Sequence, residues 1–184
     1  MPSASNNVGS TRNCEELNVA IIGGGITGIT LALGLSARGV RWTVYERAPA
    51  LREIGAGVAL SPNAERAIRI LDPRAHAAFK RVAAPNGEDY FQWVDGTTDQ
   101  LLFCLAIRGD GPEAFEGCRR SDFLEELAKL IAEDEAQGNG QVKFGKAIDN
   151  IEDVEGEDED ENGRVILTFK DGTSAEADVG EFDN

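Results

Sequence analysis

Apolar residues near the start of the chain form two short runs with a helical pattern between them. Residues 19–22 are consecutive apolar residues, which is typical of a parallel strand buried on both faces. Residues 26–38 follow with helical spacing, and Gly39 ends the helix. Residues 40–45, rich in β-branched and aromatic residues, predict a second strand. The helix face that we expect to be buried comprises Ile26, Ile29, Leu33 and Ala37.

The middle of the chain predicts two short helices and a hairpin. A Ser-Pro pair at residues 61–62 starts a helix, which Asp72 and the proline after it break. A second short helix covers residues 72–79. Residues 90–94 and 101–105 flank a polar loop and predict an antiparallel hairpin. We expect its aromatic side chains to belong to the core, and the alternative is that they wall a substrate cavity.

The last third of the chain predicts one long helix followed by strands. Ser121 is the expected N-cap, and residues 138–140 end the helix. Residues 141–148 predict a strand, and residues 164–169 and 174–179 pair across a short polar turn. The buried face of the long helix is expected to comprise Leu124, Leu127 and Ile131.

Three glycines join the first strand to the first helix with the spacing G-x-G-x-x-G. Gly23 permits a tight turn, Gly25 lets the backbone approach a pyrophosphate, and Gly28 lets the helix pack close to the strand. The N–H groups at the helix start then face the anion. Glu46 lies 23 positions after Gly23, near the roughly 20-residue offset at which an acidic side chain binds the adenosine ribose. This register predicts dinucleotide binding rather than a purely structural turn.

Other features have both a functional and a structural interpretation. Gly55 and Gly57 flank one alanine before the capped helix, so the backbone can pass close to another molecule, or the segment is a plain glycine loop. Arg119 and Arg120 precede a helix start, where a guanidinium can clamp a phosphate or a flavin edge, or they are surface arginines. His76, the single histidine, is expected to be a structural or surface residue rather than a catalytic base.

Charge and composition reduce the range of binding partners that we expect. The 184 residues carry a formal net charge of −15, which argues against nucleic-acid and anionic-membrane partners. No apolar stretch is long enough to span a membrane, and residues 1–13 lack the apolar segment of a secretory signal, so we expect a cytoplasmic protein. Cys14, Cys104 and Cys118 have no C-x-x-C spacing, which disfavours a disulfide framework and a zinc site.

Together the motifs resemble those of the group A flavoprotein aromatic monooxygenases, most closely the salicylate-hydroxylase-like branch. The resemblance covers the chain from about Leu17 to Val179, and the stretch beginning at Gly55 is the most diagnostic. The matching stretches are residues 23–28 with Glu46, residues 55–64, residues 120–124 and residues 144–146.

The resemblance implies an α/β fold, namely an incomplete Rossmann-like FAD-binding domain of the GR2 type with an inserted β-hairpin and a β-meander. It implies FAD as cofactor, NADH or NADPH as co-substrate, and hydroxylation or epoxidation of a small aromatic or conjugated substrate by molecular oxygen through a flavin hydroperoxide. It assigns no catalytic residue and no metal. The cofactor-binding residues that it implies are Gly23, Gly25, Ile26, Thr27, Gly28, Glu46, Arg47, Gly57, Val58 and Arg120.

The resemblance ends near the C-terminus. After Val179 the family continues through an apolar strand into a Gly-x-Asp-Gly motif, whereas this sequence has residues 180–184 and stops. We therefore expect a truncated monooxygenase. The expected organisation is a disordered leader at residues 1–16, a partial FAD-binding domain at residues 17–179 with an acidic flexible loop at residues 152–163, and a divergent tail at residues 180–184.

One structural consequence and two rival functions follow. The glycine-turn strand is expected to lose neighbours in its sheet, which leaves an apolar edge for self-association. A catalytically inactive FAD-binding remnant or an interaction module is the alternative function. An ordinary NAD dehydrogenase is disfavoured because no catalytic acid or base follows the glycine turn.

Overall fold

The computed structural model describes residues 17–51, 56–85, 90–106, 115–154 and 163–182. The leader expected at residues 1–16, Gly55 and residues 155–162 of the acidic run lie outside the described residues.

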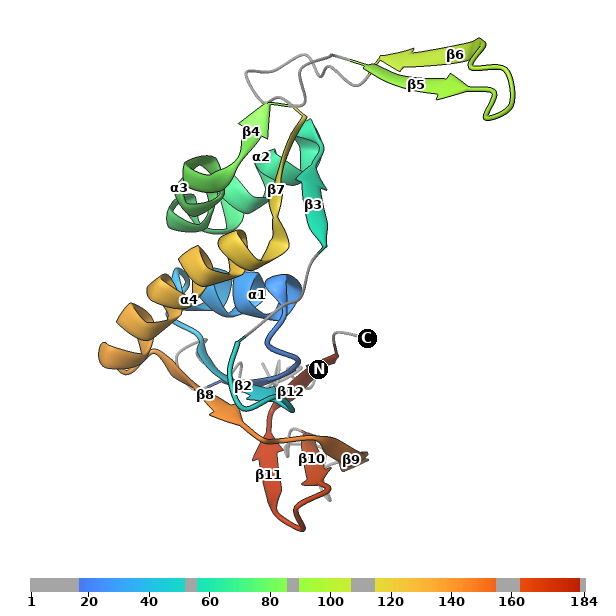
Figure 1. The fold of residues 1–184 in the computed structure, drawn as a ribbon. Coiled ribbons are helices and arrows are strands. Elements are labelled where there is room, and N and C mark those ends of the chain that lie inside the picture. Colours follow the sequence, from blue (N-terminus) through green and yellow to red (C-terminus); the bar gives the residue numbers. More distant parts are fainter. Residues whose placement is uncertain (1–16, 52–55, 86–89, 107–114, 155–162, 183–184) are drawn as a thin grey trace, which may run out of the picture.

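A parallel sheet of four strands forms the centre of the molecule (Figure 1). Its order is β12-β1-β2-β8. The expectation that the glycine-turn strand β1 forms an open edge is wrong, because β12 pairs with it along residues 19–22. Backbone pairing needs no particular side chain, so part of the tail expected to diverge forms a strand. The strands are β1 (Asn18–Ile22), β2 (Arg41–Glu46), β8 (Gly140–Phe144) and β12 (Val179–Phe182).

Helices cover one face of this sheet (Figure 1). Ile29 and Leu33 of α1 are buried there, as expected, and so are the three leucine and isoleucine positions expected in α4. Ala37 is exposed, contrary to expectation, because α1 ends at Ser36 and Gly39 turns the chain with φ +70°. The helices are α1 (Ile26–Ser36), α2 (Pro62–Leu71), α3 (Pro73–Val82) and α4 (Arg120–Ala136).

A meander of three antiparallel strands covers the other face of the sheet. Tyr45 packs on Phe169, with 4.8 Å between ring centroids. The hairpin of β10 and β11 is confirmed. The single strand expected at residues 141–148 is wrong, because Gly145, with φ +71°, turns the chain between β8 and β9. The strands are β9 (Ile148–Val154), β10 (Arg164–Phe169) and β11 (Ser174–Ala177).

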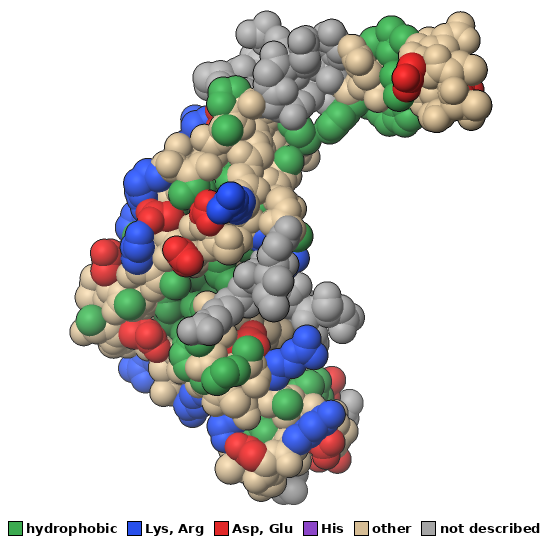
Figure 2. All heavy atoms as spheres, in the orientation of Figure 1, with side chains coloured by type: hydrophobic (Ala, Val, Ile, Leu, Met, Phe, Trp, Pro, Cys, Tyr) green, Lys and Arg blue, Asp and Glu red, His purple; other side chains and the backbone are tan. Residues whose placement is uncertain are grey.

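The expected aromatic hairpin forms, from β5 (Tyr90–Val94) and β6 (Leu101–Ala106). The expectation that its aromatic side chains are core is wrong: Phe91 is 39%, Trp93 49% and Phe103 56% exposed. The sheet has two strands and projects from one end of the molecule (Figures 1 and 2). A two-stranded hairpin provides no second layer against which to bury its face, so its rings contact one another instead.

A small antiparallel sheet joins the helices to the glycine segment. It consists of β3 (Gly57–Leu60), β7 (Glu116–Arg119) and β4 (Ala84–Pro85), in the order β3-β7-β4. Part of the segment interpreted as a glycine loop is therefore a strand. Ser121 is not the N-cap of α4, because β7 continues into the helix with Arg119 at that position.

The helix start expected at residues 61–62 is confirmed. Ser61 is the N-cap of α2 and Pro62 its first residue. Its hydroxyl bonds the Asn63 side-chain oxygen at 2.6 Å rather than a backbone N–H group of the first turn.

A buried ionic triad connects α3 to α4. Asp72 and Asp134 are 2% and 1% exposed, and Arg74 lies between them. The guanidinium donates to Asp72 at 2.7 Å and to Asp134 at 2.8 Å, while the Arg74 N–H also donates to Asp72 at 2.7 Å. Hydrogen bonds to Asp134 and Asp72 raise the pKa of Arg74. The arginine thus compensates two carboxylates that water does not reach.

A third buried carboxylate lies between α2, α3 and β7. Glu65 is 3% exposed and accepts from His76 at 2.8 Å and from Lys80 at 3.2 Å. Lys80 also pairs with Glu116 at 2.6 Å. Burial opposes ionisation of Glu65, but the hydrogen bonds from His76 and Lys80 outweigh it and lower its pKa. This contact gives His76 a structural role.

We expect this carboxylate to make the protein sensitive to acid. Because the folded-state pKa of Glu65 lies below its unfolded value of about 4.3, its ionised form stabilises the fold above that pH, and the stabilisation is lost as pH falls through the folded-state pKa. Urea unfolding between about pH 5 and pH 3 should show a shallower loss of stability for Glu65→Gln than for the unchanged chain. An identical slope for both proteins would contradict this role.

None of the described helices combines the length and apolarity that a membrane-spanning helix requires.

Candidate functional site

The glycine turn after β1 is too tight for side chains at two of its positions. Gly23 has φ +116°, a conformation that L-residues with side chains rarely adopt. Its N–H donates to the Tyr45 carbonyl at 3.0 Å, which ties the turn to β2. A Cβ on Gly28 would lie 2.1 Å from the Gly23 carbonyl oxygen. The helix therefore packs against the turn only because residue 28 is glycine.

The turn delivers the N-terminus of α1 to the edge of the sheet. Gly25 is the N-cap in extended conformation, and Ile29 N–H donates to its carbonyl at 3.0 Å. The first turn of the helix carries no acidic side chain. The N–H groups of residues 26–28 precede the first intrahelical bond, so the helix start is a site for an anionic group.

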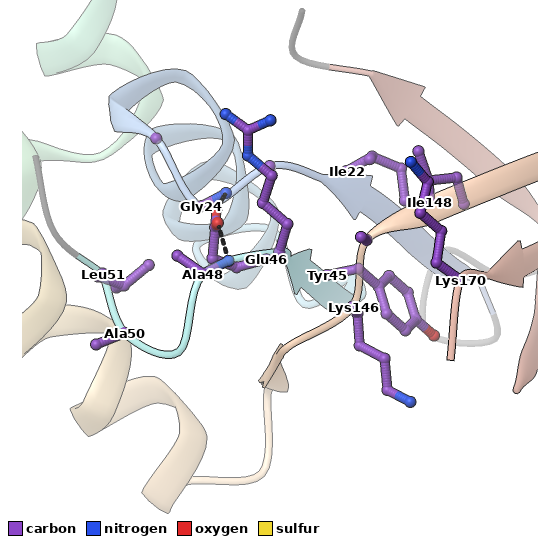
Figure 3. Close-up of a pocket in the computed structure, with 14 residues that line it drawn as sticks. Ile22, Gly24, Tyr45, Glu46, Ala48, Ala50, Leu51, Lys146, Ile148 and Lys170 are labelled. Atoms are coloured by element: carbon purple, nitrogen blue, oxygen red, sulfur yellow. Dashed lines mark hydrogen bonds between the residues drawn. The ribbon is translucent and has the colours of Figure 1, made fainter. Parts of the chain in front are cut away.

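Glu46 is held beside this helix start by two backbone groups (Figure 3). Its carboxylate oxygens accept from Gly24 N–H and from Ala48 N–H, both at 2.6 Å. Each carboxylate oxygen has two lone pairs, so each can accept a further hydrogen bond. A Cβ on Gly24 would lie 2.9 Å from the Glu46 oxygen and 2.6 Å from Leu51. The arrangement fixes a carboxylate at the end of β2, where it can still accept from hydroxyl groups.

A cavity of about 600 Å³ opens next to Glu46. Its volume falls within the range of about 300–1,000 Å³ that is usual for ligand sites. Besides Glu46 it has three charged residues, Arg47, Lys146 and Lys170. The other lining residues are Ile22, Gly23, Gly24, Gly25, Tyr45, Ala48, Ala50, Leu51, Ala147 and Ile148.

Lys146 is tied to the meander, away from Glu46 (Figure 3). Its ammonium donates to Asp171 at 2.6 Å and to Thr173 at 2.8 Å, and it lies 5.4 Å from the centre of the Phe169 ring. The hydrogen bonds from Lys146 and Thr173 hold the pKa of Asp171 far below its usual range. Burial raises the pKa of Tyr45, which also lines the cavity. The cavity wall formed by the meander is therefore fixed by charge as well as by packing.

The structure places the predicted site residues in three groups. One group lines the cavity beside Glu46 and comprises Gly23, Gly25, Glu46 and Arg47. A second lines a separate cavity on the flank of α1 and comprises Ile26, Thr27 and Gly28. The third group comprises Gly57, Val58 and Arg120 and lies where β3 meets the start of α4. There Gly57 pairs with Arg119, and the Arg120 N–H donates to the Ala56 carbonyl at 3.0 Å.

Sequence reasoning missed several residues of the cavity. Gly24 and Ala48 act through their backbone N–H groups, for which side-chain chemistry gives no signal. Lys146 belongs to residues 144–146, one of the stretches on which the family resemblance rests. The sequence therefore indicated this position but not the contact of its ammonium with Asp171. Among the described residues, no group of three or more His, Cys, Asp and Glu side chains is arranged to hold a metal ion.

A parallel sheet with a glycine turn and a fixed carboxylate at the end of the second strand defines the class of Rossmann-like dinucleotide-binding proteins. The family model described as pyridine nucleotide-disulphide oxidoreductase matches residues 18–61, which include the turn and Glu46.

Curated relatives match most of the chain. It is 50% identical to the FAD-dependent monooxygenase azaH of Aspergillus niger over 173 residues, covering 89% of this chain and 37% of that protein. It is 48% identical to the FAD-dependent monooxygenase pigN of Monascus ruber, covering 93% and 38%. It is 37% identical to the salicylate hydroxylase asL1 of Sarocladium schorii, covering 90% and 34%.

Solved structures match the fold. HpxO of Klebsiella pneumoniae, complexed with FAD and uric acid, superposes with a TM-score of 0.65 at 22% identity, covering 91% of this chain and 39% of that one. The 2,6-dihydroxypyridine-3-hydroxylase of Arthrobacter nicotinovorans gives 0.60 at 23% identity, covering 89% and 36%.

Over 89% to 93% of its length the chain is similar to these FAD-dependent monooxygenases and this salicylate hydroxylase, and it spans between 34% and 38% of the length of these three curated relatives. The resemblance and the Rossmann-like fold class expected from the sequence are both confirmed.

Proposed function

We propose that this chain forms the FAD-binding part of an FAD-dependent monooxygenase. The observation that carries the proposal is the Glu46 carboxylate, held at 2.6 Å by the N–H groups of Gly24 and Ala48 beside the glycine turn and a cavity of about 600 Å³. An adenine dinucleotide offers both groups that this arrangement can recognise, because it has ribose hydroxyls and a pyrophosphate. Relatives at up to 50% identity carry the name FAD-dependent monooxygenase.

The residues present fit the adenosine half of FAD. Gly23 and Gly25 line the cavity without side chains, and the start of α1 provides N–H groups for a pyrophosphate. Glu46 accepts from the ribose hydroxyls, and a carboxylate there repels a 2′-phosphate. Arg47 borders the same cavity, where its charge complements a phosphate. FAD, when bound, supplies the oxidation chemistry, and the protein binds and orients it.

The pairing of β3 with β7 forms the second part of the proposed cofactor surface. Gly57 and Val58 lie on β3, next to the residue from which α4 starts, so Arg120 stands at the positive end of that helix. We assign these three residues to the flavin end of the cofactor. Ile26, Thr27 and Gly28 form the first turn of α1 directly after Gly25, and we assign them to the pyrophosphate of the cofactor.

The remaining parts of the proposal concern the whole activity. The chain covers about 37% of its Aspergillus niger relative, so proposals for the complete reaction concern more of the protein than the residues described. We propose NADH or NADPH as reductant, molecular oxygen, and a small aromatic or conjugated substrate, in the cytoplasm. Self-association, also proposed from the sequence, would use the outer edge of β12, which pairs with no further strand among the described residues, since β1 is paired on both sides.

Flavin retention tests the proposal. The chain is purified with excess FAD and desalted, and the visible spectrum of bound flavin is recorded. We expect a retained, protein-shifted flavin band, with Glu46→Gln raising the FAD Kd by about 10-fold or more, because an amide that replaces a charge-assisted acceptor loses about 1.5–3 kcal/mol. Glu133→Gln, on the exposed side of α4, is the matched control and should bind like the unchanged chain. A colourless protein that is folded by circular dichroism would reject FAD binding and favour the alternative of an interaction module.

A further inference from the structure

The small sheet of β3, β7 and β4 is held to the helices by few buried contacts. None of the residues of its three strands is buried, whereas β1 and β2 have several buried side chains. The pairing of β4 with β7 involves two residues of β4, and one of them, Pro85, has no N–H group to donate. Packing and backbone pairing therefore fix β7 less firmly than they fix the strands of the central sheet.

Lys80 of α3 links this small sheet to the helices through two carboxylates. Its ammonium lies 2.6 Å from Glu116, the first residue of β7, and 3.2 Å from the buried Glu65 of α2. Burial opposes the charged form of Lys80, but its hydrogen bonds to Glu116 and Glu65 outweigh burial and raise its pKa. One ammonium group therefore joins α2, α3 and β7.

The helix that carries Lys80 is itself fixed in the core. Phe79, the preceding residue, is fully buried and packs on Phe123 of α4, with 5.3 Å between ring centroids. His76 lies one turn earlier on α3 and holds Glu65 independently at 2.8 Å. Loss of the Lys80 ammonium would therefore release β7 while Glu65 keeps a hydrogen-bond partner.

A shift of β7 is transmitted to the residues that we assign to the flavin. β7 ends at Arg119 and α4 begins at the next residue, Arg120 (Figure 1). Gly57 of β3 pairs with Arg119, and Val58 follows it in the same ladder. Because these residues are joined by backbone bonds and by strand pairing, the position of β7 determines the position of all three residues of the flavin end.

We propose that Lys80 is a positioning residue for the flavin end of the cofactor site, because through Glu116 it fixes β7 and thereby the start of α4 at Arg120. The inference rests on the proposed function, in which FAD supplies the flavin. Lys80 lies outside the lining of the cavity beside Glu46. Its loss should therefore affect the flavin half of FAD and leave the adenosine half unaffected.

Hydrogen exchange of the cofactor-free full chain is the first test. In Lys80→Met, the amides of residues 57–60 and 116–120 should exchange up to about fivefold faster, the factor that corresponds to an ion pair of about 1 kcal/mol. Lys129→Met is the matched control, because Lys129 pairs with Glu126 within α4. In this control the same amides should exchange as in the unchanged chain.

Cofactor binding is the second test. We expect Lys80→Met to raise the FAD Kd about two- to fivefold, since fewer molecules have the flavin end in its binding arrangement. The visible band of the bound flavin should change in shape, while the Kd of adenosine diphosphate stays the same. Lys80→Arg should restore the FAD Kd and the flavin band, because a guanidinium can also bridge the two carboxylates.

Three outcomes would overturn the positioning role. Equal exchange of β3 and β7 in Lys80→Met and Lys129→Met would show that Lys80 does not fix the small sheet. Faster exchange with an unchanged FAD Kd and an unchanged flavin band would show that the sheet does not position the flavin. An equal rise in the Kd values of FAD and adenosine diphosphate would indicate a general loss of structure. An unchanged chain that retains no FAD would instead reject the proposed function, and this role with it.

Discussion

Replacement of Arg74 by methionine should lower the free energy of unfolding by about 3 kcal/mol, the lower end of the range for breaking a buried ion pair. The substitution leaves the carboxylates of Asp72 and Asp134, which are 2% and 1% exposed, without their cation. We place the effect at the lower end because the Arg74 side chain is itself 39% exposed and because Asp72 keeps its bond from the backbone N–H of residue 74. Urea unfolding followed by circular dichroism measures it.

Arg81→Met is the matched control for this experiment. Arg81 lies on the same helix and also pairs with a glutamate of α4, Glu126, but its side chain is 52% exposed. Exposed pairs contribute about 0–1 kcal/mol, so this variant should unfold close to the unchanged chain. Adding Asp134→Asn to Arg74→Met removes one buried charge that has lost its partner, and it should restore part of the lost free energy of unfolding. Similar values for Arg74→Met and Arg81→Met would show that the triad does not stabilise the junction of α3 and α4.

Gly28→Ala should abolish FAD retention and destabilise the first strand–helix unit. The added Cβ would lie 2.1 Å from the Gly23 carbonyl oxygen and 3.1 Å from Ile21 Cγ2, and a backbone atom cannot move aside as a flexible side chain can. Relief of this clash pushes α1 away from the turn, so its N–H groups no longer face the pyrophosphate. We expect the FAD Kd to rise by about 100-fold or more, which corresponds to about 2.7 kcal/mol, and fluorescence titration measures it.

Gly34→Ala on the same helix is the control that distinguishes an effect on the glycine turn from a general effect on α1. Its added Cβ would meet side-chain atoms of Leu71 at 2.5 Å, which can rotate away, and it lies two turns from the pyrophosphate site. This variant should retain FAD, with any loss confined to stability. An FAD Kd for Gly28→Ala equal to that of Gly34→Ala would show that the cofactor does not bind at this turn. A folded but flavin-free unchanged chain would reject the proposed function itself.

Local sequence signals were sufficient for the first half of the central sheet. The apolar run of β1, the glycine spacing and the acid at the end of β2 are all set within residues 18–46, where turn sterics and strand alternation act over short distances. The start of α2 at Ser61 and Pro62 was predicted for the same reason. What makes these features predictable is that their causes are neighbours in sequence.

The features that the sequence did not predict depend on partners far along the chain. Gly180 and Glu181 interrupt the apolar run that indicates a buried strand, yet β12 forms because β1 offers its backbone groups for pairing. The hairpin residues have the composition of a core, but burial requires a facing layer, about which their own sequence says nothing. The contact of Lys146 with Asp171 spans 25 positions and arises only when the meander folds onto the sheet.

The two hydrogen bonds that hold Glu46 also bear on how a ligand is selected. Backbone N–H groups of Gly24 and Ala48 already fix the carboxylate in the free protein, so little conformational freedom remains to be lost on binding. A preordered acceptor loses less entropy than a mobile one and tolerates less variation in the position of the donor hydroxyls. Selectivity at this end of the proposed FAD site would therefore rest on the shape of the main chain, and we expect substitutions far from Glu46 that shift the turn to alter which nucleotides bind.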